Sequence, residues 1–310
     1  MEGAGTTVRF VVVGAGRLGA SLALALRGHG SALLGFTART SQGRANAESW
    51  LGMPSSPGLP ELVGRQPDLY ILAVPDQALP TVAGGLAALL AASKPPHHPF
   101  VAHTSGATSV DVLAPCVEAG GTALVFHPLQ TFTDAVTGAG RFLGAAIAVT
   151  TSDGRADSPA AQLGFGLAIT LGARPFLLPD DKRGLYHTAA TVACNYLVTL
   201  EHQAKRLFVT AGLPEEQALS LFLPLVETTL ANIATHGTVE ALTGPLSRGD
   251  TDTIATHLAA LAADAPGLVP LYRVLGLASL DIVRARGEIP SQVVDTLAEM
   301  LAGPIDSSSF

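Results

Sequence analysis

Hydrophobic residues in the first half of the chain gather in short, nearly continuous runs rather than in alternation with polar residues. "VRFVVV" and "DLYILAV" are examples, and helical stretches separate one run from the next. Continuous apolar runs of this length are typical of strands that are buried on both faces of a parallel sheet. The pattern predicts strands at 8–13, 31–38, 68–74, 100–105, 122–127, 145–151 and 174–178.

The pattern changes after Pro179, where every segment has a helical period. Residues 180–212 begin with acids, end at a glycine and predict one long helix. Further helices are expected at 213–237, 250–264, 266–287 and 290–303. The sequence therefore predicts an α/β domain with a doubly wound parallel sheet at 1–178, followed by an all-α domain at 179–310.

The helical half is rich in Leu and Ala, and this composition favours burial of one face against a second subunit, so a homodimer is expected. A self-contained bundle is the alternative. A net charge of −7 without a basic domain argues against nucleic acid as a partner. No apolar run of about 18 residues lacks an interruption, so a membrane span is not expected. Two cysteines give no disulfide framework, and a cytoplasmic location is the simplest expectation.

"GAGRLG" at residues 14–19 follows the first predicted strand and opens a helix. In a G-x-G-x-x-G loop the first glycine permits the tight turn, and the second lets a pyrophosphate approach the backbone. The third permits close helix–strand packing, while the amides of the helix face the anion. A dinucleotide site is therefore expected at Gly14, Gly16, Arg17, Leu18 and Gly19.

The segment after the second strand carries arginines where an acid is usual. A site selective for NAD places Asp or Glu about 20 residues beyond the glycines, to bind the ribose 2′-hydroxyl. Here Arg39, Thr40 and Ser41 occupy this place, and no acid occurs from residue 8 until Glu48. A guanidinium and two hydroxyls suit a 2′-phosphate, so NADP(H) is the expected cofactor. The alternative is that these arginines are ordinary solvated residues.

Two later strand ends extend this site, because ligands of open α/β sheets lie beyond the carboxyl ends of the strands. One turn contains Val74, Pro75 and Asp76, and the other contains Thr104, Ser105 and Gly106. Both turns could flank the ribose and nicotinamide. The alternative is that proline and glycine are there only as turn formers.

Polar residues at two further places are candidates for catalysis. His127 ends the last core strand, and Pro128 is expected to stop that strand. His187, Thr191 and Asn195 follow one another at intervals of four on the long helix and share a stripe about 80° wide on a 3.6-residue helix. A single histidine is often structural, and a polar stripe can be a packing network, so both alternatives stay open.

Arg248 lies in the polar segment "LTGPLSRGD" and could bind a substrate carboxylate with its planar fork. Pairing with Asp250 is the alternative. The nine histidines form no ligand spacing of a known metal motif, so no metal is expected.

The set "GAGRLG", "VPDQAL", "HTSGA", "FHPLQTF", "YHTAATVACNYLVTL" and "ALTGPLSRGD" resembles the Rossmann-like/DUF2520 family over residues 8–262. This family is similar to the 6-phosphogluconate-dehydrogenase-like reductases, which include ketopantoate and pyrroline-5-carboxylate reductases. The resemblance implies a dinucleotide domain followed by a helical domain. In the resembled dehydrogenases, Lys and Asn on the long helix transfer a proton and anchor substrate. Here His187 stands in place of the Lys, so His187 and His127 are both candidate proton donors.

The expected activity is NADP(H)-dependent hydride transfer to a small carbonyl substrate that carries a carboxylate, with a 2-oxo acid of ketopantoate type as the first candidate. A cyclic imine acid of pyrroline-5-carboxylate type is the second. A sensor that binds NADPH without turnover is the alternative from another class of protein.

Overall fold

The computed structural model describes residues 5–303, and within them the chain divides into two compact units. One unit ends at Cys194 and the other begins at Asn195. The predicted domain boundary near residue 178 coincides with the end of the last strand. Residues 180–194 are helical, yet they belong to the first unit. Asp180 and Arg183 of this segment form hydrogen bonds with the loop after β4.

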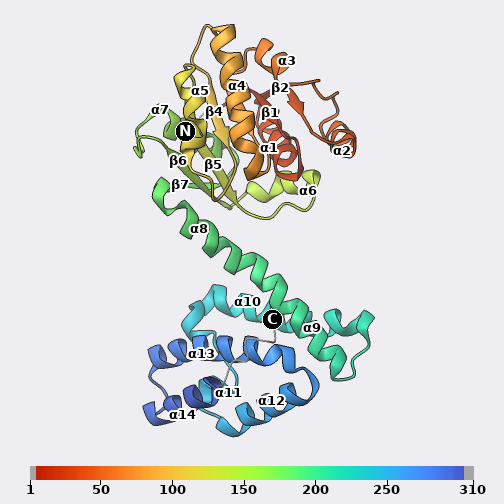
Figure 1. The fold of residues 1–310 in the computed structure, drawn as a ribbon, viewed down its shortest axis with the longest axis vertical. Coiled ribbons are helices and arrows are strands. Elements are labelled where there is room, and N and C mark those ends of the chain that lie inside the picture. The colour runs from red at the N-terminus through yellow and green to blue at the C-terminus, as the bar shows by residue number, and fades with distance from the viewer. Residues whose placement is uncertain (1–4, 304–310) are drawn as a thin grey trace. The chain divides into compact units, whose positions relative to one another are not determined.

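A seven-stranded sheet forms the centre of the first unit, in the order β2-β1-β3-β4-β5-β6-β7 (Figure 1). All neighbours are parallel except β5 and β6. The predicted α/β class with a following helical region is confirmed. The strands are β1 (Arg9–Val13), β2 (Ala32–Thr37), β3 (Leu69–Leu72), β4 (Phe100–His103), β5 (Thr122–Leu129), β6 (Ala146–Thr151) and β7 (Arg174–Leu177).

Helices cover both faces of this sheet, which explains why its strands are continuously apolar. Along β1, Phe10 and Val12 pack into one core with residues of α1 (Arg17–Gly28) and α7 (Pro159–Thr170). Val11 and Val13 point to the other core, with α3 (Leu59–Gly64) and α4 (Leu79–Ser93). Every residue of β1 after Arg9 is therefore buried, whichever face of the sheet its side chain points to.

The expectation that Pro128 stops the fifth strand is wrong. β5 continues through Pro128 to Leu129, and Pro128 is opposite Ile147 of β6. On its other side β5 pairs with β4 only as far as Val125. Beyond Val125 the strand has a neighbour on one side only, and an edge position of this kind tolerates a residue that lacks an N–H donor.

The second unit is helical and has a small core of its own. Its helices are α9 (Tyr196–Thr210), α10 (Glu215–Glu240), α11 (Pro245–Arg248), α12 (Thr251–Asp264), α13 (Val269–Arg286) and α14 (Ser291–Leu301). Ile254, Leu280 and Leu297 are completely buried in its core. In α10, by contrast, only Ala218 and Phe222 are buried, and Gly237 has a non-helical φ of 79°.

Two stretches of the second unit, Glu215–Arg248 and Pro266–Arg286, are long and apolar enough to cross a membrane by length and composition alone. Only 11% and 22% of their most apolar windows are buried. Helices that pack an apolar face against another protein have the same length and composition.

Candidate active site

The sheet changes winding direction at β1, which has β2 on one side and β3 on the other. In open α/β sheets this switch point is where a crevice forms beyond the carboxyl ends of the strands. The glycine loop follows β1 there, and the turn containing Val74 follows β3. The two loops are in contact, because a Cβ on Gly14 would lie 2.6 Å from Cγ1 of Val74.

The three glycines of the loop differ in their surroundings. Gly14 has a φ of +92°, in the left-handed region that favours glycine. A Cβ on Gly16 would meet nothing within 4 Å, so an anion has open space above this residue. A Cβ on Gly19 would lie 2.6 Å from the carbonyl oxygen of Gly14, which shows close packing of α1 on the loop. This geometry fits the turn, approach and packing that a pyrophosphate site requires.

The first turn of α1 begins with Arg17 and Leu18, directly after Gly16. No side chain caps the amides of this turn, and no acidic residue lies in it. Uncapped amides at a helix N-terminus carry partial positive charge and attract phosphate. Arg17 is exposed and Leu18 is half-buried.

The segment predicted to bind a 2′-phosphate forms the start of α2 (Ser41–Leu51). The Thr40 hydroxyl accepts a hydrogen bond of 3.0 Å from the Gly43 amide and caps this helix. Arg39 and Ser41 are exposed, and the first turn of α2 contains no acid. Arg39 and the amino end of α2 therefore present positive charge together just beyond β2.

The turn after β4 is shaped by its own side chains. The Ser105 hydroxyl accepts hydrogen bonds from the amides of Ala107 and Thr108, at 3.3 and 3.0 Å. Thr104 and Ser105 are buried, whereas Pro75 and Asp76 on the turn after β3 are exposed.

Gly106 brings the two candidate histidines together. A Cβ at this position would lie 2.6 Å from Cδ2 of His187 and 2.8 Å from Nε2 of His127. The two imidazole centroids are 6.2 Å apart. The first unit thus places His127, His187 and the turn at Gly106 in one cluster.

His127 has a second partner that the sequence analysis missed. Its Nδ1 lies 3.0 Å from Oη of Tyr186, which is on α8 (Arg183–Ala190). Burial lowers the pKa of His127 to about 4, and the nearby charge of Arg183 acts in the same direction. The imidazole is therefore neutral at pH 7.

Arg183 is the largest fully buried side chain of the described residues. Its Nε donates to the carbonyl oxygen of Thr108 at 2.7 Å, and one terminal nitrogen donates to Oγ1 of Thr150 at 3.0 Å. The other terminal nitrogen donates to the carbonyl oxygen of Ser105. Arg183 therefore holds the turn that carries Gly106.

His103 at the end of β4 was also missed, although it stands directly before the predicted turn. Its Nδ1 accepts from the Ser105 amide at 3.2 Å, and its Nε2 lies 3.3 Å from the carbonyl oxygen of Ser109. Burial lowers the pKa of His103 to about 4. The sequence pattern places His103 in the predicted strand at 100–105, but it does not indicate that the side chain bonds the following turn.

The long helix contains a wide turn that the sequence does not reveal. Residues Thr191–Asn195 form a π-helical turn between α8 and α9. An i→i+5 turn holds more residues than an α-helical turn. The 80° stripe of His187, Thr191 and Asn195 assumed a uniform 3.6-residue helix, so the position that it gives to Asn195 is wrong. The Thr191 hydroxyl donates to the carbonyl oxygen of His187 at 3.0 Å.

Asn195 and Arg248 belong to the second unit, so the cluster in the first unit forms without them. Both are exposed. Asp250 uses its carboxylate to cap α12, accepting from the Thr253 amide at 3.0 Å. Among residues 5–303 no ion pair joins Arg248 to Asp250. The pKa of Asp250 is lowered mainly by its hydrogen bonds with Thr253, and the charge of Arg248 has a smaller effect in the same direction.

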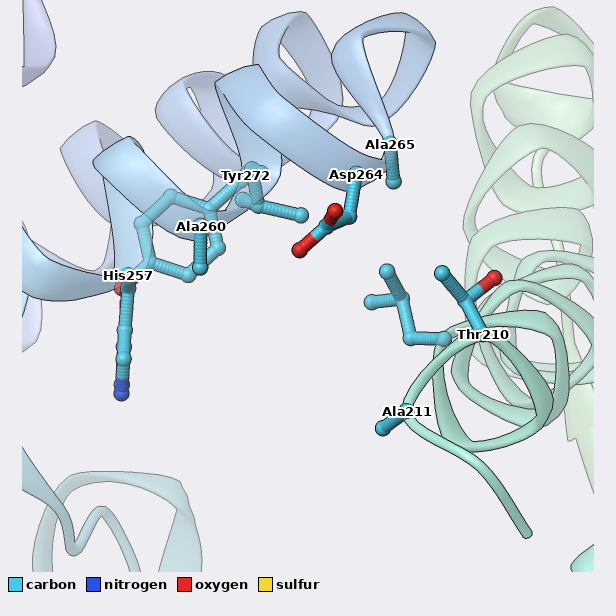
Figure 2. Close-up of a pocket in the computed structure, with 9 residues that line it drawn as sticks. Thr210, Ala211, His257, Ala260, Asp264, Ala265 and Tyr272 are labelled. Atoms are coloured by element: carbon cyan, nitrogen blue, oxygen red, sulfur yellow. Dashed lines mark hydrogen bonds between the residues drawn. The ribbon is translucent and has the colours of Figure 1, made fainter.

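The second unit has two apolar cavities that share His257 and Tyr272. One, of about 340 Å³, is shown in Figure 2, where Thr210 and Ala211 face His257, Asp264 and Tyr272. The other, of about 350 Å³, includes Thr243 from the predicted polar segment. His257 Nδ1 and Tyr272 Oη are 2.9 Å apart. Within residues 5–303 no group of three potential metal ligands occurs.

This fold and its glycine loop define a protein of two parts, a dinucleotide-type domain followed by a helical domain. Residues 5–128 match the family model of the Rossmann-like domain, and residues 149–279 match that of the domain of unknown function DUF2520. The chain therefore carries a Rossmann-like domain followed by a DUF2520 domain, which confirms the resemblance seen in the sequence.

Solved structures of similar fold cover nearly the whole chain. A candidate NADP oxidoreductase from Bacteroides fragilis is 25% identical, with 87% of this chain and 96% of that chain covered and a TM-score of 0.67. A Thermotoga maritima protein is 21% identical over 94% and 98%, with a TM-score of 0.62. Pyrroline-5-carboxylate reductase from Streptococcus pyogenes is 16% identical over 94% and 99%, with a TM-score of 0.59. The last two likenesses show the fold alone. No curated protein matches the sequence.

Proposed function

We propose that this protein is an NADP(H)-dependent oxidoreductase that reduces a small carbonyl or imine substrate. The observation that carries the proposal is the glycine loop, in which Gly14 has the required φ and Gly16 has open space above it, at the same sheet edge as the two histidines. The similar Bacteroides fragilis structure, described as a candidate NADP oxidoreductase, supports the same class.

The residues of the first unit suggest how the cofactor would be held. The amides of α1 at Arg17 and Leu18 would bind the pyrophosphate, and Arg39 with the start of α2 would bind the 2′-phosphate. The turns Val74–Asp76 and Thr104–Gly106 would flank the ribose and nicotinamide. When bound, NADPH supplies a hydride. The proton would come from His187 or His127, and Thr191 of the same unit would help to position a carboxylate substrate. The substrate-binding roles of Asn195 and Arg248 stay predictions from the sequence, because both residues belong to the second unit.

Two substrate classes remain in the proposal, a 2-oxo acid and a cyclic imine acid. The Streptococcus pyogenes neighbour is a pyrroline-5-carboxylate reductase, which favours testing the imine class first. The structures compared above lend no support to ketopantoate. NADPH oxidation, followed by absorbance, should be measured with both classes, using His187→Ala and Asn195→Ala as variants. Tight NADPH binding without oxidation by any substrate would support a sensor instead.

Cofactor choice is tested by replacing Arg39. Arg39→Ala should weaken NADPH binding about tenfold to a hundredfold, because a hydrogen bond to a charged group contributes about 1.5–3 kcal/mol. NADH binding should stay nearly unchanged in a fluorescence titration. Arg155→Ala is the control, since Arg155 pairs with Asp157 at the surface. Equal loss of both dinucleotides would contradict the 2′-phosphate assignment.

We also propose that the active protein is a homodimer joined through its helical unit. Leu221 and Leu225, one turn apart on α10, are 57% and 66% exposed. A helix with this many uncovered leucines needs a partner surface, and a second copy of the chain supplies the same apolar face.

A further inference from the structure

We propose that Tyr186 is a positioning residue that holds His127 in one neutral tautomer, with the proton on Nε2 turned toward Gly106. The proposal rests on the proposed reductase function and assigns different tasks to the two histidines. Its basis is the geometry around the His127 ring, which has one nitrogen at Tyr186 and the other at Gly106.

The hydrogen bond between Tyr186 and His127 has a defined direction. Among residues 5–303, the Tyr186 hydroxyl has no hydrogen-bond partner other than Nδ1 of His127. Burial raises the pKa of Tyr186, so the phenol keeps its proton. A phenol with a single partner that can accept uses its proton to donate. Nδ1 of His127 therefore accepts, and Nε2 carries the ring proton.

The surroundings of the His127 ring disfavour a positive charge on it. The groups that act on His127 are Arg183, His187, Asp76 and His103, and only Asp76 favours a positive ring. Arg183 is buried, and its N–H groups donate to backbone and hydroxyl oxygens. Because none of these acceptors is a carboxylate, they do not neutralise the positive charge that Arg183 places beside the histidines. Burial and this neighbouring cation keep His127 neutral.

His127 and His187 would have different tasks in the proposed reduction. NADPH, when bound, would supply hydride to the substrate carbonyl carbon. The Nε2–H of His127 would donate a hydrogen bond to the negative charge that develops on the substrate oxygen as the C=O electron pair moves onto it. A neutral imidazole is a poor acid but an effective donor of this kind. The proton that completes the alcohol would then come from His187, and water would return a proton to this residue.

Imidazole ¹⁵N NMR of the full-length protein tests the tautomer directly, and loss of a signal in His127→Gln identifies the ring. We expect His127 to be protonated on Nε2 alone at pH 7 and to remain neutral down to pH 5, in line with its pKa of about 4. In Tyr186→Phe we expect a mixture of both tautomers. Protonation on Nδ1, or an unchanged spectrum in Tyr186→Phe, would overturn the proposal.

Kinetics separate the positioning role from a merely structural one. Tyr186→Phe should lower kcat roughly tenfold with little change in KM, as expected when a residue that orients a catalytic group is lost. Tyr196→Phe is the matched control, because Tyr196 is 56% exposed on α9. Equal kcat in Tyr186→Phe and wild type would overturn the catalytic part. Absence of turnover with every substrate would refute the proposed function, while the NMR result would still decide the tautomer.

Discussion

At the scale of single residues, an added methyl group should lower the stability of the protein at Gly14 but not at Gly16. In Gly14→Ala, the φ of +92° and the carbonyl oxygen of Ala73, 2.7 Å from the new Cβ, both oppose the change. We expect a loss of about 1–3 kcal/mol in the free energy of unfolding. Gly16→Ala adds a methyl group in open space and should fold normally.

Gly16→Ala should nevertheless weaken NADPH binding, because the methyl group would occupy the approach of the pyrophosphate. Urea denaturation and dinucleotide titration, performed on both variants, separate folding from binding. Unchanged NADPH affinity in Gly16→Ala would contradict the proposed position of the pyrophosphate.

The buried His103 and the half-buried His127 should make the protein less stable in acid. The folded pKa of His103 and of His127 is about 4, below the ordinary value of 6.5. Between pH 6.5 and 4 the unfolded chain binds protons that the folded protein does not, so stability is complete above pH 6.5 and falls as the pH drops. At pH 5 each histidine should cost up to about 2 kcal/mol.

Urea denaturation at pH 7.5 and pH 5 measures this loss. His103→Gln should reduce the difference between the two pH values, whereas His236→Gln, at an exposed position on α10, should leave it unchanged. An identical pH dependence in His103→Gln and wild type would contradict the assignment.

At the scale of secondary-structure elements, Asp180 connects the segment before α8 to the loop after β4. Its carboxylate accepts from the Ser109 hydroxyl at 2.5 Å and from the Val110 amide at 2.9 Å. Asp180→Ala leaves both donors without this partner and should cost about 1–3 kcal/mol in thermal or urea unfolding.

The adjacent Asp181 provides the control for this prediction. Asp181 pairs with Lys182 at the surface, and both side chains are more than 60% exposed. Asp181→Ala should change stability by less than about 0.5 kcal/mol. Equal effects of the two substitutions would show that the loop contact of Asp180 contributes nothing.

The strands and the glycine loop were predictable because local physics determines them. A strand buried on both faces must be apolar at its buried positions, and β1 is apolar at every position after Arg9. Arg183 was not predictable, because its partners at Ser105, Thr108 and Thr150 are brought to it only by the fold. Nor does any residue type mark the π-helical turn, which depends on how the backbone bonds are shared.

At the scale of the whole molecule, the helical unit leads to a prediction about mass. Light scattering after size exclusion should give twice the chain mass of 31.6 kDa. Replacing Leu221 and Leu225 together by Asp should give the single-chain mass, because charges in a dimer interface lose their water.

Leu143→Asp is the control for the dimer, since Leu143 is 79% exposed in the first unit. It should leave the mass unchanged. A wild-type protein with the single-chain mass would refute the proposed dimer.

Thr40, which caps α2, lies at the proposed 2′-phosphate site, so its side chain bears on the preferred coenzyme. Aspartate caps a helix at least as well as threonine does, so Thr40→Asp preserves the helix while it places a negative charge beside the adenosine ribose. Under the proposed cofactor assignment, one substitution reverses the electrostatic preference without loss of foldability. The coenzyme preference and the stability of the scaffold would then be set by separate properties of one side chain, its charge and its ability to cap the helix.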